Sequence, residues 1–216
     1  MSNISKNNKI FKSRKIILEQ LKKRGYDVSE YENFSLNEID ILNQNNQLDM
    51  LIEEEESQEE KNDKKKKKCY IKYHLTGKLT KSNIYEYIED LFNIENVLTD
   101  SDDFIIIIKD KINATLKSFI TNLYFKDKKF INIYNINRYL FNILDHSMVP
   151  SHIPIETDEE KALLEKKFNI MNPKQWPEIS RFDPVAQAIG LRPNQLCKIF
   201  RKSQTSSISI YYRLCI

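Results

Sequence analysis

The sequence predicts a mixed α/β (α+β) protein of two domains, each built on a mixed sheet with helices packed against it. Helix-like and strand-like periodicities alternate through the first 145 residues, and a separate series of helix caps and strands follows a proline-broken stretch. With 216 residues, of which 40% are hydrophobic, the chain is long enough to build more than one core. We therefore expect domains at 1–145 and 146–216, the second with two helices.

In the first domain, helical spacing of apolar residues alternates with short β-like runs. Gly25 ends the first helical segment as a left-handed stop, and Ser35 with Glu38 forms a capping box for a further short helix. The long helical segments are 10–24, 84–92 and 113–124, and the strand-like runs are 47–52, 68–75, 104–109 and 130–134. The third run is almost continuously apolar, which is typical of a strand buried on both faces. These alternating segments predict a mixed sheet flanked by helices.

A block of opposite charges separates the first two strand-like runs. Residues 53–68 contain seven acids and six lysines, so their charges nearly cancel. We expect two hairpin strands joined here by a long, solvated, mobile loop. The alternative is a lysine arm that binds nucleic acid or acts as a localisation signal.

The second domain begins after residues 145–154, whose two prolines and two histidines indicate a linker. A capped helix is expected at 157–168. Asp183 is placed to cap a short helix with Pro184 at its first position and Gly190 as its left-handed exit. Two strands follow, at 196–202 and 208–216. In the second, alternate residues Ile208, Ile210, Tyr212, Leu214 and Ile216 should face the core, while Ser209, Tyr211, Arg213 and Cys215 form a polar partner surface.

Several functional classes lack support in the sequence. The net charge of +3 is too small to demand nucleic acid, although all of the excess lies beyond residue 147. No run is apolar enough for a membrane span or a signal peptide, so we expect a soluble, intracellular chain. The three cysteines are widely spaced, and His146 and His152 have no further ligand at a familiar spacing, so neither a disulfide framework nor a metal site is expected.

One enzymatic alternative stays open, a metal-dependent nuclease or the relic of one. Asp49 and Lys72 lie on two adjacent strand-like runs, as in the nuclease pattern Asp…(Asp/Glu)-x-Lys. However, Tyr70 stands where the second carboxylate belongs, and a tyrosine is a poor ligand for a hard divalent cation. A free DNA-binding regulator is disfavoured, because the helix after Asp183 is too short and too apolar to read bases in the major groove.

The last seventy or so residues resemble the C-terminal domain of a known family. The residues that carry the resemblance are His146, Val149, Pro150, His152, Asp183, Pro184, Val185, Ala186, Gly190, Lys198, Ile199, Arg201, Ser203, Thr205, Tyr212, Arg213 and Leu214. Through them the chain is similar to a small subunit of archaeal RNA polymerases and to its eukaryotic counterpart, the fifth common subunit (Rpb5), and large DNA viruses also encode members of this family. Residues 12–28 and 84–124 also resemble the additional N-terminal domain of the eukaryotic form, whose fold is nuclease-like.

The resemblance implies a non-catalytic subunit of a multisubunit, DNA-dependent RNA polymerase. It implies an assembly domain docked on the largest subunit, contacts with other subunits, and a jaw near downstream duplex DNA, with no membrane, metal or cofactor. We expect docking through Asp183, Pro184, Arg192, Arg201, Tyr212 and Arg213, phosphate proximity for Lys109, Lys111 and Lys117, and a hinge at His146, Val149, Pro150 and His152. The expected location is the nucleus for a cellular protein, or the virion or host cytoplasm for a viral one.

The chain departs from the family pattern at several turns. The family usually has a glycine at the position of Asn194, a proline at that of Lys202, and a glycine near Ser206 or Ser207. The Thr-Pro-Ser-Ala turn that the eukaryotic jaw presents beside DNA is here the segment 113–116, of sequence Asn-Ala-Thr-Leu. We therefore expect a hairpin of different shape and an altered jaw contact.

Overall fold

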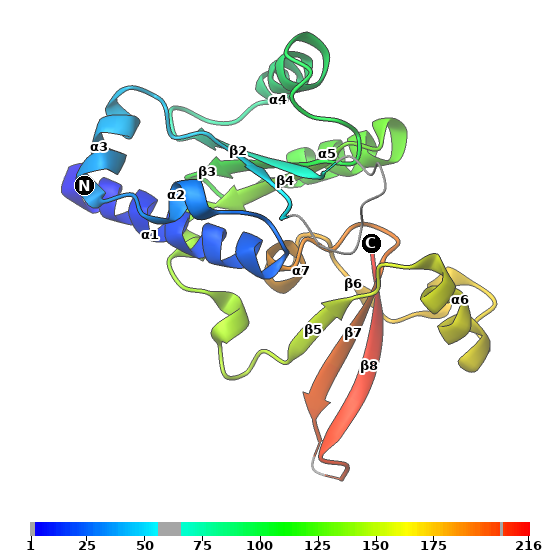
Figure 1. The fold of residues 1–216 in the computed structure, drawn as a ribbon. Helices are drawn as coiled ribbons and strands as arrows, with labels where there is room; N and C mark the ends of the chain where they lie inside the picture. The colour runs from blue at the N-terminus through cyan, green and yellow to red at the C-terminus, as the bar shows by residue number, and fades with distance from the viewer. Residues whose placement is uncertain (1–2, 56–65, 204) are drawn as a thin grey trace. The chain divides into compact units, whose positions relative to one another are not determined.

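The computed structural model describes residues 3–55, 66–203 and 205–216, which form two compact units, Met1–Phe141 and Asn142–Ile216 (Figure 1). Within these described ranges each unit contains one four-stranded mixed sheet with helices. The predicted class, a mixed α/β protein with two mixed sheets, is confirmed. The division between the units falls near the expected boundary of 145/146, which stays a prediction.

The sheet of the first unit has the order β1-β2-β3-β4. Strand β1 (Met50–Glu53) is antiparallel to β2 (Lys68–His74), whereas β2, β3 (Asp103–Ile108) and β4 (Phe130–Asn135) run parallel. Every residue of β3 is buried. This agrees with the expectation from its apolar run, since a central parallel strand is covered on both faces.

Helices cover both faces of this sheet (Figure 1). The helices are α1 (Asn3–Lys23), α2 (Ser29–Glu32), α3 (Leu36–Gln44), α4 (Lys81–Ile88), the π-helical turn η1 (Glu89–Ile94), α5 (Ala114–Asp127) and the 3-10 turn η2 (Ile136–Tyr139). Ile105 and Ile107 join the core that contains α1 and α3, whereas Phe104, Ile106 and Ile108 join the core beneath α4, η1 and α5. The alternation of a single strand therefore feeds two separate cores.

The capping box predicted at Ser35 and Glu38 is present, whereas the first helix begins earlier than predicted. The Ser35 hydroxyl accepts from the Glu38 N–H at 3.3 Å while the Glu38 carboxylate accepts from the Ser35 N–H at 2.7 Å, which confirms the capping box. The first helix begins at Asn3 rather than at residue 10. The early turns of this helix are held by hydrogen bonds rather than by a stripe of apolar side chains. Asn7 forms these bonds with Asp40 and Asn43 on α3.

The charged block 53–68 lies between β1 and β2, and its two end residues belong to these strands. The loop prediction is wrong at Glu53, which belongs to β1 and pairs with Lys68, the first residue of the predicted run 68–75. The side chains of this pair form an ion pair of 3.0 Å. The pairing continues one step further, where Glu54 donates its N–H to the carbonyl of Lys67 at 2.9 Å. Residues 56–65, the middle of the predicted loop, lie outside the described residues.

The sheet of the second unit has the order β5-β7-β8-β6. Strands β5 (Ser151–Pro154) and β7 (Leu196–Lys202) are antiparallel, as are β7 and β8 (Ile208–Cys215), while the short β6 (Glu178–Ile179) runs parallel to β8. The helices are α6 (Asp158–Lys167) and α7 (Pro184–Ala188), with 3-10 turns η3 (Ile143–Asp145) and η4 (Pro173–Gln175). The linker prediction is wrong for Ser151–Pro154, because these residues extend the sheet by pairing with β7.

Left-handed backbone conformations occur just after two of the helices, α1 and α7, and in the turn before β7. Gly25 (φ 85°) and Gly190 (φ 68°) act as the predicted left-handed stops. Asn194, which stands where the family usually has glycine, also has a positive φ, of 67°. Asparagine tolerates this conformation better than most residues with a side chain, so the turn is kept without the glycine.

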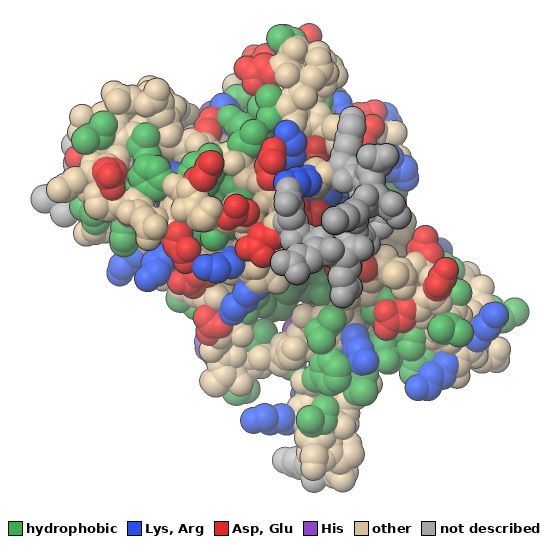
Figure 2. All heavy atoms as spheres, viewed as in Figure 1, with side chains coloured by type: hydrophobic (Ala, Val, Ile, Leu, Met, Phe, Trp, Pro, Cys, Tyr) green, Lys and Arg blue, Asp and Glu red, His purple; other side chains and the backbone are tan. Residues whose placement is uncertain are grey.

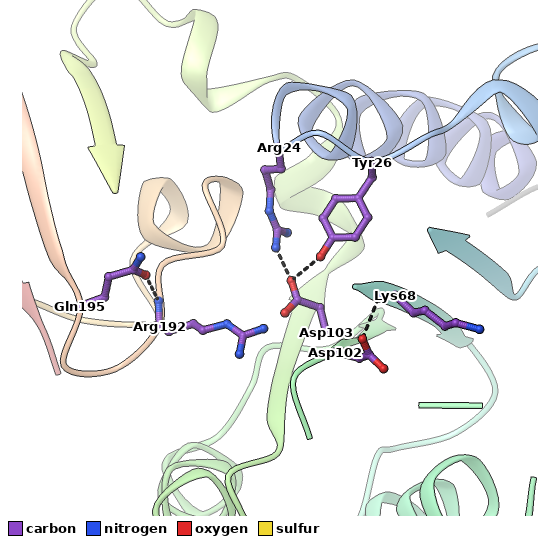
Figure 3. A network of polar contacts seen from close by, with 7 residues as sticks. All are labelled: Arg24, Tyr26, Lys68, Asp102, Asp103, Arg192 and Gln195. Atoms are coloured by element: carbon purple, nitrogen blue, oxygen red, sulfur yellow. Dashed lines mark hydrogen bonds and ion pairs between the residues drawn. The ribbon is translucent and has the colours of Figure 1, made fainter. Parts of the chain in front are cut away.

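A buried ion pair joins the end of α1 to the start of β3. The Arg24 guanidinium and the Tyr26 hydroxyl both point at the Asp103 carboxylate (Figure 3), and the side chain of Asp103 is 3% exposed. Burial by itself would lower the pKa of Arg24, but Asp103 together with the nearby side chains of Tyr26, Tyr134 and Cys69 outweighs it, and the net shift is upward. The neighbouring Asp102 accepts from the Lys68 N–H at 2.7 Å and from the Thr99 N–H at 2.7 Å. At the start of β3, Asp103 thus contacts the end of α1 and Asp102 contacts the start of β2.

We expect Arg24→Met to lower the free energy of unfolding by about 3–5 kcal/mol, because it removes a positive charge that faces the buried Asp103 carboxylate. Denaturant unfolding of the full chain measures this loss. The matched control is Lys22→Met, which removes an ion pair with Glu32 whose partners are 55% and 52% exposed. Such an exposed pair contributes about 0–1 kcal/mol. Equal effects of the two substitutions would contradict the role of the buried pair.

Candidate functional site

The hairpin of β7 and β8 presents two different faces. Pairing places Lys198 with Tyr212, Phe200 with Ile210, and Lys202 with Ile208 on one face, which we call the apolar face. The other face, here the arginine face, carries the pairs Cys197 with Arg213, Ile199 with Tyr211, and Arg201 with Ser209. The two faces follow from the alternation of side chains along a strand.

Both faces are covered by helices only at the base of the hairpin. On the apolar face, Leu196 and Leu214 pack with Leu164 of α6, Trp176 and Ile155. On the arginine face, Cys197, Ile199 and Cys215 pack with Ala186 of α7, Leu191 and Ile179. The base is therefore a small two-sided core.

The outer half of the hairpin leaves apolar side chains in solvent. Ile208 is 61% exposed, Ile210 49%, and Ile153 of the neighbouring β5 49%. Hydrophobic side chains gather over β7 and β8 in Figure 2, with basic side chains beside them. The prediction of a core face is therefore wrong for Ile208, Ile210 and Ile216, while Cys215, assigned to the polar face, is fully buried. Alternation reveals the two faces of a strand but not where the covering helices end.

An aromatic group extends the apolar face toward α6. The rings of Phe168, Trp176 and Tyr212 have centroids 5.6–6.2 Å apart, at tilted or edge-on angles that suit aromatic pairs. Phe168 is 47% exposed, whereas Trp176 is buried. Aromatic side chains that are partly covered in this way are common anchors in protein interfaces.

The hairpin is basic on both faces. Residues 196–216 contain Lys198, Arg201, Lys202 and Arg213 and no aspartate or glutamate. The last three of these basic residues are exposed, and the Lys198 ammonium lies over the Phe200 ring, 5.1 Å from its centroid. An acidic partner surface would complement this charge.

The predicted docking residues lie on the hairpin strands, in the turn before β7 and at the start of α7. Arg201 and Arg213 share the arginine face, whose base is covered by α7, while Tyr212 points to the apolar face. Arg192 is half-buried in the turn before β7, where its N–H donates to the side chain of Gln195 at 3.0 Å (Figure 3). In α7 only Pro184 is partly exposed, because Val185–Ala188 are all buried. The helix therefore offers a partner little beyond Asp183 and Pro184.

Asp183 acts as the predicted helix cap, accepting from the Val185 N–H at 2.9 Å with Pro184 in the first turn. We expect Asp183→Ala to lower the stability of the full chain by about 0.5–2 kcal/mol, the usual loss for a helix cap, as measured by denaturant unfolding. Asp183→Asn is the control, since asparagine caps helices about equally well. A neutral Asp183→Ala, or an equally damaging Asp183→Asn, would contradict capping.

The predicted nucleic-acid-proximal lysines lie around the start of α5. Lys109 and Lys111 are exposed in the turn after β3, and Lys117 is half-buried on the helix itself. The Asn113 side chain caps α5 by accepting from the Leu116 N–H at 2.8 Å, and the first turn of the helix contains no acid. The Asn135 amide holds the turn by donating to the carbonyls of Lys109 and Asp110 at 3.0 and 2.8 Å.

The four predicted hinge residues form a turn and the start of a strand. Val149 donates its N–H to the carbonyl of His146 at 2.9 Å, and the Met148 N–H donates to the Nδ1 atom of His146 at 3.2 Å. His152 belongs to β5, and its Nδ1 lies 2.6 Å from the carbonyl oxygen of Pro150. These contacts are local to the turn and strand, and the hinge role of the four residues stays a prediction.

The residues behind the nuclease alternative come together as an internally satisfied cluster. Asp49 accepts from the Tyr73 N–H at 2.9 Å, from the Lys72 ammonium at 3.0 Å and from the Tyr70 hydroxyl at 3.3 Å. Both carboxylate oxygens therefore have protein donors. Among the described residues no three His, Cys, Asp or Glu side chains are grouped as metal ligands. This geometry gives no support to a nuclease.

Thiol chemistry has no support at the hairpin either. All three cysteines are free and buried. Burial raises the pKa of Cys197 to about 11 and that of Cys215 to about 12. Both are therefore protonated near neutral pH and act as small apolar core residues, since only the thiolate is a good nucleophile.

In the described part of the chain, no helix is long and apolar enough to cross a membrane.

These features define a mixed α/β protein of two units, the second of which presents a basic, partly apolar sheet surface suited to binding a macromolecule. Residues 141–215 match the family model of the RNA polymerase Rpb5 C-terminal domain. The chain is 42% identical over 76 residues to DNA-directed RNA polymerase subunit Rpo5 of Pyrococcus abyssi, which covers 35% of this chain and 90% of the relative. The chain belongs to the Rpb5 family of RNA polymerase subunits.

The similarity to a eukaryotic relative extends over both units. The chain is 27% identical over 209 residues to the DNA-directed RNA polymerases I, II, and III subunit rpabc1 of Dictyostelium discoideum. The matched stretch covers 97% of this chain and 98% of the relative. The chain is 42% identical over 77 residues to the corresponding RPABC1 subunit of Caenorhabditis elegans, 36% of each chain. The expectation of an accessory polymerase subunit, inferred from the residues of the second unit, is confirmed.

Proposed function

We propose that the chain assembles into a multisubunit, DNA-dependent RNA polymerase by docking its second unit on the largest subunit, while its first unit forms a jaw beside the downstream duplex. In a eukaryotic cell this role places it in the nucleus. The single observation that supports docking best is the hairpin of β7 and β8, whose outer half combines exposed Ile208 and Ile210 with Arg201 and Arg213.

Exposed apolar side chains on one face of the hairpin and exposed arginines on the other give a composition suited to a stable interface between subunits. Burying the isoleucines would contribute through the hydrophobic effect, and the arginines would select an acidic partner and orient it. The predicted docking residues Arg201 and Arg213 lie on the face next to α7, and Tyr212 lies on the opposite face. We propose that the largest subunit contacts both faces of the hairpin.

The jaw role rests on the basic turn before α5. Lys109 and Lys111 are exposed beside a helix N-terminus whose first turn has no acid, and both features favour phosphate oxygens. Contacts of this kind position a duplex without reading its sequence. They suit a subunit that follows downstream DNA of any sequence.

Co-purification tests assembly. We expect a tagged wild-type chain, expressed in its native source, to recover the largest polymerase subunit, identified by mass spectrometry. Arg201→Glu with Arg213→Glu should lower this recovery about tenfold or more at low salt, because reversed charges repel an acidic partner. Lys166→Glu with Lys174→Glu, exposed on α6 and η4, makes the same change in net charge and serves as control. Failure of the wild-type chain to recover the largest subunit would overturn the proposal.

The salt dependence of duplex binding tests the jaw. In the assembled polymerase, Lys109→Gln with Lys111→Gln should reduce the slope of log affinity against log salt by about 0.9 for each phosphate that these lysines neutralise. Lys126→Gln with Lys128→Gln, at the opposite end of α5, is the matched control. An unchanged slope for the first pair, or an equal change for both pairs, would contradict phosphate contacts at this turn.

A further inference from the structure

Strand β8 is paired unequally on its two sides. Toward β7 it is paired along seven positions, from Ile208 to Leu214. Toward β6 it is paired only at Leu214 and Cys215, opposite Glu178 and Ile179. In the described residues the side of β8 away from β7 is therefore a sheet edge from Ile208 to Arg213, and in Figure 1 this part of the hairpin extends past β6.

The backbone groups along this edge can be assigned from the pairing. Leu214 donates its N–H to the carbonyl of Pro177 at 2.8 Å, and Ile216 donates to Ile179 at 2.9 Å, so even-numbered residues point away from β7. Cys215 donates to Gln195 on the opposite side at 2.9 Å. Because backbone groups alternate along an antiparallel strand, the N–H and C=O groups of Ile208, Ile210 and Tyr212 point outward from the edge.

The two edges of this sheet differ in how well they resist a further strand. The β5 edge is only four residues long and ends at Pro154, which has no N–H to offer. The free part of β8 contains neither a proline nor a residue with a positive φ, and three of its residues are isoleucine or tyrosine with at least 49% exposure. A long, apolar edge of this kind readily accepts a strand.

We propose that the outer edge of β8 binds an extended segment of another polymerase subunit as an added strand. This inference rests on the proposed function, which supplies the partner. Backbone groups of Ile208, Ile210 and Tyr212 would pair with the incoming strand, as in other cases of strand addition. The free chain thus carries an incomplete sheet that assembly completes.

The side chains of the hairpin define the chemistry of the incoming segment. On the apolar face it would place apolar residues beside Ile208 and Ile210, and on the arginine face it would place an acid beside Arg213, the arginine of β8 itself. The absence of any acid from residues 196–216 favours such a partner by charge complementarity. The occupant we infer is therefore an extended segment with alternating apolar and acidic residues.

Hydrogen exchange of single amides tests the inference without any substitution. In the free full chain we expect the amides of Ile210 and Tyr212 to exchange fast and those of Tyr211 and Arg213 to exchange slowly, because the latter point toward β7. When the labelled chain is reconstituted into polymerase that lacks it, Ile210 and Tyr212 should slow by about tenfold or more, since each gains a hydrogen bond. Tyr211 is the internal control. If Ile210 and Tyr212 remain fast in the assembled enzyme, the inference is wrong.

A pair of substitutions separates the backbone of Ile210 from its side chain. Ile210→Pro removes the outward N–H, whereas Ile210→Ala shortens the side chain and keeps the N–H. We expect the proline variant to bind polymerase about tenfold or more weakly than the alanine variant, with thermal unfolding of both free chains confirming that each is folded. Equal binding by the two variants would overturn strand addition and leave the proposed function intact. Failure of the wild-type chain to assemble would overturn both proposals.

Discussion

The antiparallel pairing of β7 with β8 is the interaction on which the whole second unit depends. Strand β5 is attached through β7, and β6 is attached through β8. The helix α6 packs at the base of one face of this hairpin and α7 at the base of the other. Because α7 has only five residues, it is too short to be stable alone and requires this packing. A change that weakens the ladder therefore disturbs the cores on both sides together.

The sequence predicted local features well where a few adjacent residues decide the structure. The Ser35–Glu38 capping box, the Asp183 cap and the left-handed Gly25 and Gly190 all depend on contacts within a turn or two, so their residue types are sufficient signals. The two faces of β8 were also predictable from alternation. The family resemblance connected the signals of the second unit to a function, because Asp183 and Gly190 are among the residues that mark the C-terminal domain.

The features that sequence reasoning missed depend on contacts distant along the chain. The extra turns of α1 are held by Asn7 against α3, and no periodicity marks them. Ser151–Pro154 contains two polar residues and a proline, yet it forms an edge strand because β7 lies beside it. The exposure of Ile208 and Ile210 depends on where α6 and α7 end relative to the hairpin. A sequence pattern does not contain these distances, and the candidate site was therefore predicted by its arginines but not by its apolar surface.

The charge of the hairpin has a second consequence for its open edge. An exposed strand edge invites pairing with another copy of the same chain, which would lead to aggregation. Two copies paired along β8 would bring the exposed Arg213 of each chain toward the basic hairpin of the other, with no acid between 196 and 216 to offset the repulsion. An acidic segment meets attraction at the same positions. The basic side chains thus disfavour pairing with a second copy of this chain and favour pairing with an acidic segment. Such charges give specificity where backbone hydrogen bonds alone cannot distinguish one strand from another.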